Sequence, residues 1–260
     1  MATTFGLGKA ELLADASENM RRELGGESWS LRQKIALTCR ILYERGHASG
    51  LAGQISARGD SPDTYYTQRF GLGFEEITAR NLLLVDEDLN VLDGQGVPNP
   101  ANRFHSRIYR VRPDVACIVH THARYTSALS MIGTPLIVSH MDTSTLWGDC
   151  AYLRDWPGIP FGNEEGRIIS EALEDKRSIL LAHHGLLVAG SRPEETCFLA
   201  GVFERAAELQ LLAMAAGDIK PIVPELGREA HDWGLGQSHV NADFQYRARS
   251  ALRRHSDCLE

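Results

Sequence analysis

Two pairs of histidines follow apolar segments of this 260-residue chain, each segment having the composition of a buried β-strand. His120 and His122 are two residues apart, and His183 and His184 are adjacent. Side chains two residues apart on a strand point to the same face, so His120 and His122 can reach one ion. Adjacent side chains point to opposite faces, so only one of the second pair is expected to join them.

Three imidazoles donated by two strand ends are a pattern typical of a divalent-metal site. Three protein ligands leave at least one position open for a substrate, which is the plan of a catalytic site rather than a closed structural one. Nitrogen ligands suit zinc, iron, manganese, nickel or cobalt. The alternative is that these histidines are ordinary hydrogen-bonded residues at strand ends, and spacing alone leaves both interpretations open.

The remaining sequence predicts a layered α/β protein. Strands alternate with helices, yet several strands follow one another closely enough to form hairpins, which favours a sheet with much antiparallel pairing. A single dinucleotide-binding unit is not expected, because no G-x-G-x-x-G precedes a helix. Apolar periodicity and Gly/Pro boundaries predict helices over 30–46, 101–113, 123–133, 164–176 and 192–217, and strands over 50–58, 64–70, 81–86, 90–94, 115–120 and within 177–190, with 133–139 leading into another.

Composition excludes several classes of partner. The formal net charge is −7, so nothing attracts the chain in bulk to nucleic acid or to an anionic membrane. No apolar run approaches the roughly 18 residues of a membrane span, and the start of the chain does not read as a secretory signal. The five cysteines include no C-x-x-C pair and sit mostly in apolar patterns. These features predict a cytoplasmic enzyme with a small-molecule substrate.

Three motifs in this order resemble the class II aldolase/adducin family: "GLAGQISAR", "RFHSRIYRVRPDVACIVHTHARYTSAL" and "LLAHHGLLVAG". The resemblance implies a three-layer α/β/α sandwich, a bound divalent metal and a cyclic homotetramer with sites between subunits. It implies metal ligands at His120, His122 and His184. It also suggests a lead-in over 1–29, the family domain over 30–217 and an extension over 218–260 that completes the site or an interface.

The sequence departs from the family at the residues that would handle acid and phosphate. The aldolases and epimerases of the family carry an acidic residue four positions before the histidine that matches His105, and here that position is Ala101. The asparagine of the Gly-rich turn is replaced by Gln54, and Pro100 removes a backbone N–H from the expected phosphate loop. A sugar phosphate is therefore not the expected substrate, although Gln54 still counts as a substrate-binding candidate.

Cationic and titratable residues supply the other candidates. Arg69 and Arg103 lie in segments that the resemblance places around the pocket, where a guanidinium would bind a carboxylate through its two-pronged face. Asp142, or His140 beside it, matches an acid/base segment of the epimerases, although the pair suits a turn equally well. His231 in the C-terminal extension would reach the site of a neighbouring subunit.

These observations predict a metal-dependent carbon–carbon lyase, cleaving by retro-aldol reaction or decarboxylation through a metal-stabilised enolate. Zinc is the expected metal, with manganese or iron as alternatives, and the substrate is a small hydroxy-carbonyl or carboxylated compound without phosphate. The alternatives are a histidine-ligated non-haem iron oxygenase on the same fold, a sugar-phosphate epimerase, and a non-catalytic adducin-like domain.

Overall fold

A computed structural model describes residues 4–61 and 63–260 of the chain. Within these residues, the strands form one sheet in the order β4-β3-β2-β1-β5-β8-β7-β6. Every neighbouring pair is antiparallel except β6 and β7, which are parallel. The strands are β1 Gln54–Arg58, β2 Thr64–Gln68, β3 Leu82–Asp86, β4 Val91–Asp93, β5 Cys117–Thr121, β6 Cys150–Leu153, β7 Ser178–Leu181 and β8 Gly185–Gly190.

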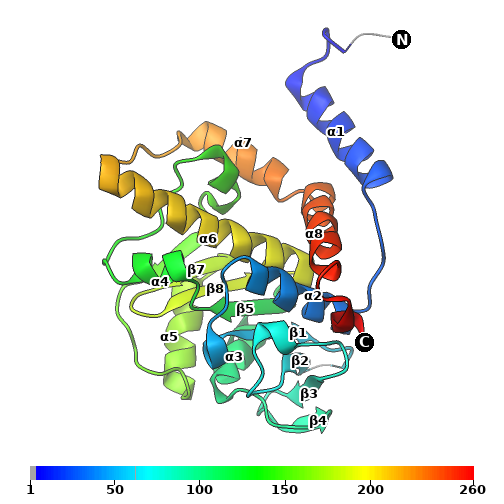
Figure 1. Cartoon of the computed structure of the whole chain (residues 1–260). Helices are drawn as coiled ribbons and strands as arrows, with labels where there is room; N and C mark the ends of the chain where they lie inside the picture. Colours follow the sequence, from blue (N-terminus) through cyan, green and yellow to red (C-terminus); the bar gives the residue numbers. More distant parts are fainter. Residues whose placement is uncertain (1–3, 62) are drawn as a thin grey trace.

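Helices cover both faces of this sheet, so the predicted three-layer α/β/α sandwich with a largely antiparallel sheet is confirmed (Figure 1). The longer apolar cluster lies between the sheet and α2, α6 and α8, and the shorter one lies between the sheet and α3 and α5. The helices are α1 Lys9–Glu23, α2 Leu31–Glu44, α3 Arg103–Val111, α4 Arg124–Ser130, α5 Asn163–Leu173, α6 Pro193–Ala216, α7 Pro224–Gly234 and α8 Gln237–Leu252.

Strand β5 occupies the middle of the sheet, and all five of its residues are buried. Its side chains alternate between the two layers: Val119 packs in the cluster under α6, and Ile118 packs in the cluster under α3. His120 follows Ile118 by two residues and therefore points to the α3 side. The apolar alternation that identified this strand thus also decides which layer receives its histidine.

Helices α2 and α6 pack together on one face of the sheet, and each begins at residues that are recognisable helix-start signals in the sequence. Ser30 caps α2 by accepting a hydrogen bond from the Gln33 N–H at 3.3 Å, while the Gln33 side chain accepts one from the Ser30 N–H at 3.1 Å. Helix α6 starts at Pro193 and ends before Gly217. None of the described helices is long and apolar enough to cross a membrane.

The segment 133–139 was expected to lead into a strand, but the short helix η4 Met141–Leu146 comes first and β6 begins only at Cys150. Residues 134–139 themselves belong to no helix or strand. Their backbone is instead held by Gln210 on α6, which accepts from the Ile137 N–H at 2.7 Å and donates to the Pro135 carbonyl at 3.0 Å. An amide side chain replaces the neighbouring strand, and the pattern of apolar residues carries no sign of that substitution.

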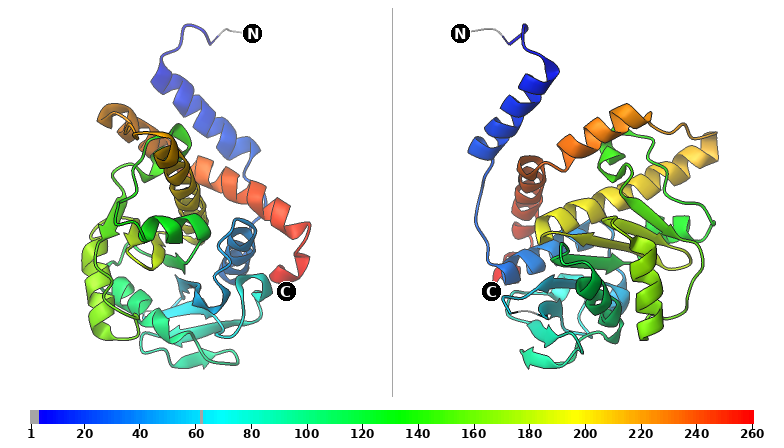
Figure 2. Two further views of the ribbon diagram at one scale, coloured as in Figure 1. Left: turned by 60° about the vertical axis from the view of Figure 1, so that its left-hand side comes forward. Right: turned by 180° about the vertical axis from the view of Figure 1, so that it is seen from behind.

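The N-terminal lead-in includes helix α1, which lies at the edge of the molecule and contacts α8, with Lys9 paired to Glu229 of α7 (Figure 2). None of its residues is buried. The predicted C-terminal extension forms α7 and α8, and α8 packs on α2 and α6. The boundaries 1–29, 30–217 and 218–260 remain a prediction. Helix α8 shares the large apolar cluster with the residues before it, so no separate core marks a boundary at 218.

Candidate metal centre

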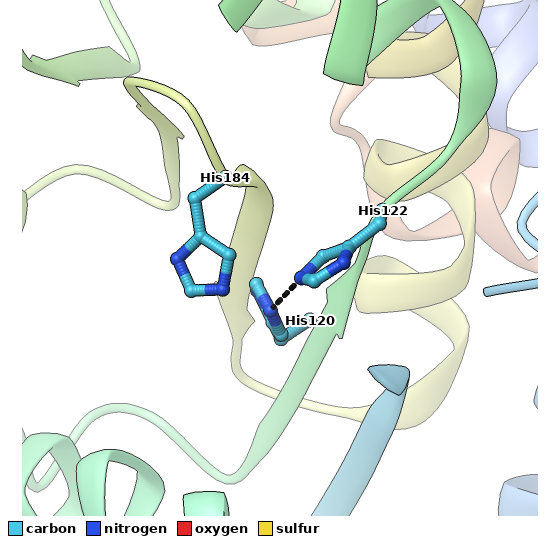
Figure 3. Close-up of side chains that lie close together, drawn as sticks. All are labelled: His120, His122 and His184. Atoms are coloured by element: carbon cyan, nitrogen blue, oxygen red, sulfur yellow. Dashed lines mark hydrogen bonds between the residues drawn. The ribbon is translucent and has the colours of Figure 1, made fainter. Parts of the chain in front are cut away.

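His120, His122 and His184 lie together at one end of the sheet (Figure 3). One ring nitrogen of each lies within 4.8 Å of the others. The Nε2 atoms of His120 and His122 are 3.1 Å apart, and the ring centroids are separated by 4.6, 4.8 and 5.0 Å. Two nitrogens bound to one tetrahedral zinc ion lie roughly 3.3 Å apart, so small ring movements would let these three share an ion.

The β7–β8 turn brings His184 to the pair on β5. His183, at the turn, takes a left-handed conformation with φ 55° and is exposed, so only His184 enters the cluster. Gly185 begins β8 directly below the turn, and a Cβ there would collide with the Thr121 carbonyl oxygen. A side chain at position 185 would therefore separate β8 from β5 and move His184 away from its partners.

The protein fixes the tautomer of His120. Its Nδ1 lies 2.7 Å from the Leu186 carbonyl oxygen, which can only accept, so Nδ1 carries the hydrogen and Nε2 is left with a lone pair. Burial lowers the pKa of His120, and the neighbouring His184 lowers it further. Burial and then His122 lower the pKa of His184 to about 4, and burial lowers that of His122. All three rings are therefore neutral at pH 7 and able to bind a cation.

Buried polar atoms without a partner surround the cluster on the α3 side. Gln54 is the cross-strand partner of His120, and its Oε1 has no hydrogen-bond partner, while its Nε2 donates to the Ala52 carbonyl at 2.6 Å. His105 bonds Ser56 through Nδ1 at 2.7 Å and leaves Nε2 unpaired. An unpaired buried polar atom costs about 1–3 kcal/mol, so both atoms are candidates to bind a polar ligand.

Two residues that the sequence did not single out hold the backbone around the cluster. Ser49 Oγ accepts from the His122 N–H at 2.8 Å. Glu204, buried on α6, accepts from Tyr125 N–H at 2.8 Å and from Thr126 N–H and Oγ at 2.9 and 2.6 Å. Glu204 thus caps the helix that begins just after His122. A glutamate inside a long apolar helix was the signal available in the sequence.

The position at which the family carries an acidic residue is apolar in the structure. Ala101 is buried in the apolar cluster beneath α3, and its N–H is taken by the Asn99 side chain at 3.0 Å. No acidic side chain joins the three histidines in the described residues. The cluster is therefore an all-imidazole set, as the sequence suggested.

Of the two predicted arginine clamps, Arg69 is the better placed. Ser56 on β1 pairs with Thr67 on β2, which puts Gln54 and Arg69 in the same row at the end of the sheet that carries His120. Arg69 is exposed, and its side chain lies over Gly96. It makes no ion pair with any described residue.

Arg103 faces elsewhere. Together with Ser106, Arg107, Arg110 and Arg167 it lines a polar cavity on the outer side of α3, toward α5. The face of α3 that meets the sheet carries Phe104 and His105 instead. The family resemblance placed the segment of Arg103 around the pocket, but the direction of its side chain on α3 sends it to the opposite face. The structure does not bring Arg103 to the three histidines.

His140 and Asp142 form a turn. The Nδ1 atom of His140 accepts from the Asp142 N–H at 3.1 Å, which caps the short helix η4 Met141–Leu146. Both side chains are about half exposed. Asp142 lines an apolar cavity whose walls include none of the three cluster histidines. Within one chain, the pair therefore has the turn-stabilising role that the sequence left open, and a part in catalysis would require a second subunit.

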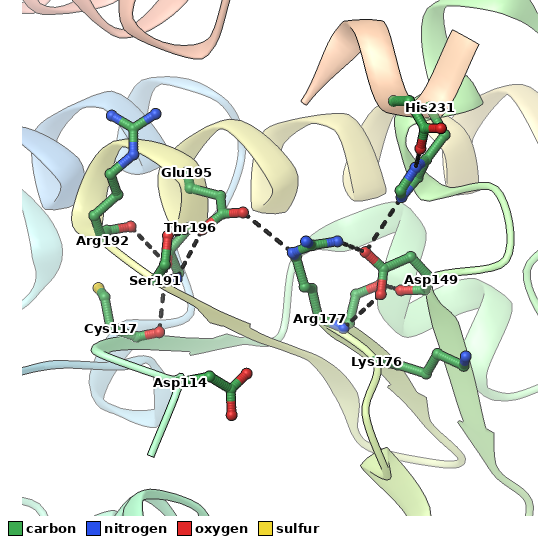
Figure 4. Close-up of polar contacts among 12 residues, drawn as sticks. Asp114, Cys117, Asp149, Lys176, Arg177, Ser191, Arg192, Glu195, Thr196 and His231 are labelled. Carbon is green, nitrogen blue, oxygen red and sulfur yellow. Dashed lines mark hydrogen bonds and ion pairs between the residues drawn. The ribbon is translucent and has the colours of Figure 1, made fainter. Parts of the chain in front are cut away.

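His231 lies beside Asp149 (Figure 4). The strands that flank Asp149 place it at the opposite end of the sheet from His184. His231 bonds Asp149, at 3.4 Å, and Asp232, at 2.9 Å. Asp149 immediately precedes β6 and is also bound by Arg177, which precedes β7. His184 follows the other end of β7. His231 can therefore contribute only to the centre of a neighbouring subunit, as its prediction required.

Known proteins resemble this chain over most of its length. The protein-family model of the Class II Aldolase and Adducin N-terminal domain matches residues 33–211 of this sequence. A 4-hydroxy-3-prenylphenylpyruvate oxygenase/4-hydroxy-3-prenylbenzoate synthase of Streptomyces roseochromogenus subsp. oscitans is 33% identical over 69% of this chain and 66% of its own length. Decarboxylase NovR of Streptomyces niveus is 32% identical over 69% of this chain and 67% of its own length. The chain thus spans about two thirds of these two relatives.

The fold has counterparts among solved structures. L-fuculose 1-phosphate aldolase from Glaciozyma antarctica PI12 superimposes with a TM-score of 0.80 at 26% identity, covering 88% of this chain and 92% of that one. The matched region contains all three cluster histidines and the motifs that surround them. On these matches, the chain belongs to the class II aldolase/adducin family.

Proposed function

We propose that this protein is a metal-dependent carbon–carbon lyase whose divalent ion is held by His120, His122 and His184. The single observation that carries the proposal is the convergence of three neutral imidazole nitrogens within 4.8 Å. The donor set fits an ion, because the Leu186 carbonyl fixes the His120 tautomer, as outer partners do in metal sites. Zinc is the first expectation, with manganese or iron as alternatives.

The chemistry follows from an incomplete set of ligands. A divalent ion with three protein ligands supplies Lewis acidity to an oxygen beside the breaking bond. Gln54 offers its unpaired carbonyl oxygen to a substrate hydroxyl. Arg69 holds a carboxylate at the rim, a role in which Arg103 is less well supported because it faces another cavity. His105, buried and unpaired at Nε2, helps to shape the polar floor.

Proton transfer requires a group that one chain does not supply beside the histidines. The family carboxylate is Ala101 here, and no acidic group joins the cluster in the described residues. We therefore infer that Asp142, His140 or His231 acts from a neighbouring subunit of a homotetramer. Light scattering would test this assembly, since a monomer with full activity contradicts it.

The proposed substrate is a small hydroxy-carbonyl or carboxylated compound without phosphate. Gln54 and Pro100 alter the expected phosphate loop, and Arg69 suits a carboxylate. Decarboxylase NovR among the relatives supports the carboxylated class, and the fuculose phosphate aldolase supports aldol cleavage. A strong preference for phosphorylated hydroxy-carbonyl compounds would contradict the proposal and favour a sugar-phosphate aldolase or epimerase.

A non-haem iron oxygenase is the second candidate. Two findings favour it: the ligand set is all imidazole, and one relative at 33% identity carries an oxygenase name. Iron content together with substrate-dependent oxygen uptake would support this candidate. Full turnover without oxygen, with release of CO₂ or an aldehyde, would support the lyase. Neither outcome, in a protein that retains no metal, would favour a non-catalytic adducin-like domain.

Metal analysis of protein purified without chelators tests the centre directly. We expect about one divalent ion per chain in the wild type and a loss of that ion in His120→Ala and His184→Ala. The matched control is His183→Asn. His183 is exposed, and asparagine tolerates the left-handed conformation of this position. Equal metal content in His184→Ala and His183→Asn would contradict the ligand assignment.

A further inference from the structure

A second cavity lies in the helical layer, apart from the three histidines. Its volume is about 520 Å³, within the range of small-molecule sites. Helices α6, α7 and α8 and the turn η4 form its walls, and Leu13 of α1 closes one side. None of the three cluster histidines lines it.

One wall of this cavity is aromatic. The His239 ring lies between two others, 5.7 Å from Phe198 and 4.9 Å from Trp233 between centroids. Both contacts are edge-on, with interplanar angles of 62° and 86°. Val202 and Leu13 extend this surface with aliphatic side chains. Such a wall provides a large apolar area for a flat or aliphatic body.

Three buried polar atoms in the same cavity lack hydrogen-bond partners. They are Trp233 Nε1, His239 Nδ1 and Thr145 Oγ1. Thr145 is 6% exposed, so solvent does not readily satisfy its hydroxyl. Buried polar atoms are nearly always paired in folded proteins, and each exception costs about 1–3 kcal/mol. Three of the thirteen such atoms in the described residues belong to the walls of this one cavity, which makes it a candidate site for a guest with hydrogen-bonding atoms.

The cavity also holds a cation without a carboxylate partner. Arg45 extends from the end of α2 across Gly201, where a Cβ would collide with its guanidinium, and donates to the Gly201 carbonyl at 2.8 Å. It makes no ion pair with any described residue. The other lining cations are paired: Arg205 with Glu208 and Arg247 with Asp243.

The nearby charges leave this cation unbalanced. Burial lowers the pKa of Arg45 and Arg247 lowers it further, while Asp243 offsets part of this effect; the pKa is lowered on balance, so the charge is held in an unfavourable place. Two acidic groups line the same cavity: Glu229, which is paired with Lys9, and Asp142, which is half exposed. An incoming anion would relieve the desolvated guanidinium.

We propose that this cavity binds a small monocarboxylate with an aromatic or other apolar body. The carboxylate pairs with Arg45 and accepts from the Trp233 indole N–H and the Thr145 hydroxyl, while the body packs against Phe198 and His239. A wholly apolar guest would leave the donors and the guanidinium unpaired. A bare phosphate would leave the aromatic wall uncovered. Within one chain the site is separate from the three histidines, and carboxylate binding there does not depend on the proposed lyase activity.

Calorimetric titration of the full-length protein with 3-phenylpropionate tests the proposal. Its amide removes the charge and acetate removes the apolar body, so both are expected to bind at least about tenfold more weakly, the value of one charged hydrogen bond or one buried ring. Saturable binding of the carboxylate alone supports the site. Absence of saturable binding at millimolar concentration, or equal binding of the amide, would overturn it.

Three substitutions locate the binding. Arg45→Met is expected to weaken it by at least about tenfold, and Trp233→Phe and Thr145→Val by about three- to tenfold each. The last two keep the ring or the shape, so they test the site even if Arg45→Met does not fold. Trp156→Phe is the matched control, because Trp156 is exposed and lies outside the cavity walls.

A fourth variant separates this site from the metal centre. Binding of 3-phenylpropionate is expected to survive in His184→Ala and in protein treated with a chelator. Loss of binding under both conditions would place the probe at the metal centre and overturn the second site. Retained binding with lost metal would support the second site whatever becomes of the proposed lyase activity.

Discussion

The two ends of the sheet carry histidines in opposite situations. At the end where β5 finishes and β8 begins, His120, His122 and His184 face one another without any acidic partner in the described residues, and their pKa values are lowered. At the end where β6 and β7 begin, His231 and Asp149 bond each other within a larger network, and the pKa of His231 is raised.

The network at the second end is closed on itself (Figure 4). Arg177 lies between two carboxylates: its guanidinium pairs with Asp149 and, at 3.2 Å, with Glu195, while its backbone N–H donates to Asp149 at 2.8 Å. Glu195 in turn accepts from the Ser191 N–H at 2.7 Å. Burial would raise the pKa of Asp149, but the bonds from His231 and Arg177 outweigh it and lower that pKa.

The comparison distinguishes charged groups that stabilise the fold from neutral groups that are available to bind a ligand. Charged groups that pair with one another fix the ends of the parallel strands and the position of α7, and most of their hydrogen-bonding capacity is used within the network. The neutral imidazoles make one mutual contact of hydrogen-bond length, between the Nε2 atoms of His120 and His122 at 3.1 Å, which a bound ion would replace. Variants of the two ends should therefore fail in different ways.

The largest effect is expected from His120→Ala at the first end. The substitution removes the ligand whose tautomer the Leu186 carbonyl fixes, so metal affinity and any metal-dependent turnover should fall by more than about 100-fold, the upper limit for loss of an outer partner. Metal titration of the chelator-treated protein measures this. Unchanged affinity would show that these imidazoles do not act as a ligand set.

Asp149→Ala should have the converse result. It leaves Arg177 and His231 half-buried without their shared carboxylate, which costs about 2–4 kcal/mol of the free energy of unfolding, while metal content stays unchanged. Urea unfolding and metal analysis measure the two halves. Asp114→Ala is the control, because its carboxylate is exposed and its pair with Arg112 should contribute at most about 1 kcal/mol. Equal destabilisation by both would remove the contrast between the two ends.

The sequence predicted the first end better than the second. Two local patterns predicted the first end: the period-two spacing of His120 and His122, and a strand running into His184. Because β5 and β8 are neighbours in the sheet, the fold brings these two patterns together. The Asp149 network joins residues from four distant segments, and no spacing in the sequence connects them.

Sequence reasoning was least informative about side chains whose direction depends on packing. Arg103 and Phe104 are adjacent, yet α3 turns Phe104 toward His120 and Arg103 toward α5. His140 accepts a hydrogen bond from the backbone N–H of Asp142 in the η4 turn. Its spacing to Asp142 in the sequence was compatible with this role and with a catalytic one. The aromatic cavity combines helices α6, α7 and α8 with α1 and η4, so its walls could not be read from any single segment.

Glu204→Gln should weaken the first end without removing a ligand. The amide cannot accept all three hydrogen bonds that the carboxylate takes from Tyr125 and Thr126, so about 1–3 kcal/mol of the free energy of unfolding should be lost. Since these residues follow His122 directly, metal affinity should fall by about tenfold. Glu208→Gln, on the same helix but at an exposed pair with Arg205, should change neither quantity. A fall in stability with unchanged metal affinity would limit Glu204 to a structural role.

The smallest effect is a pH dependence at the second end. The hydrogen bond to Asp149 raises the pKa of His231 above that of an unfolded histidine, about 6.5. The stabilisation from the charged ring is therefore complete below pH 6.5 and is lost as the pH rises through the higher folded-state pKa. His231→Gln should lower the free energy of unfolding by about 0.5–1 kcal/mol near pH 6 and by much less near pH 9. His140→Gln, at an exposed turn, should show no such difference. If the His231 variant lost equal stability at both pH values, the ring would act there as a neutral hydrogen-bonding group, and the charge contrast between the two ends of the sheet would no longer hold.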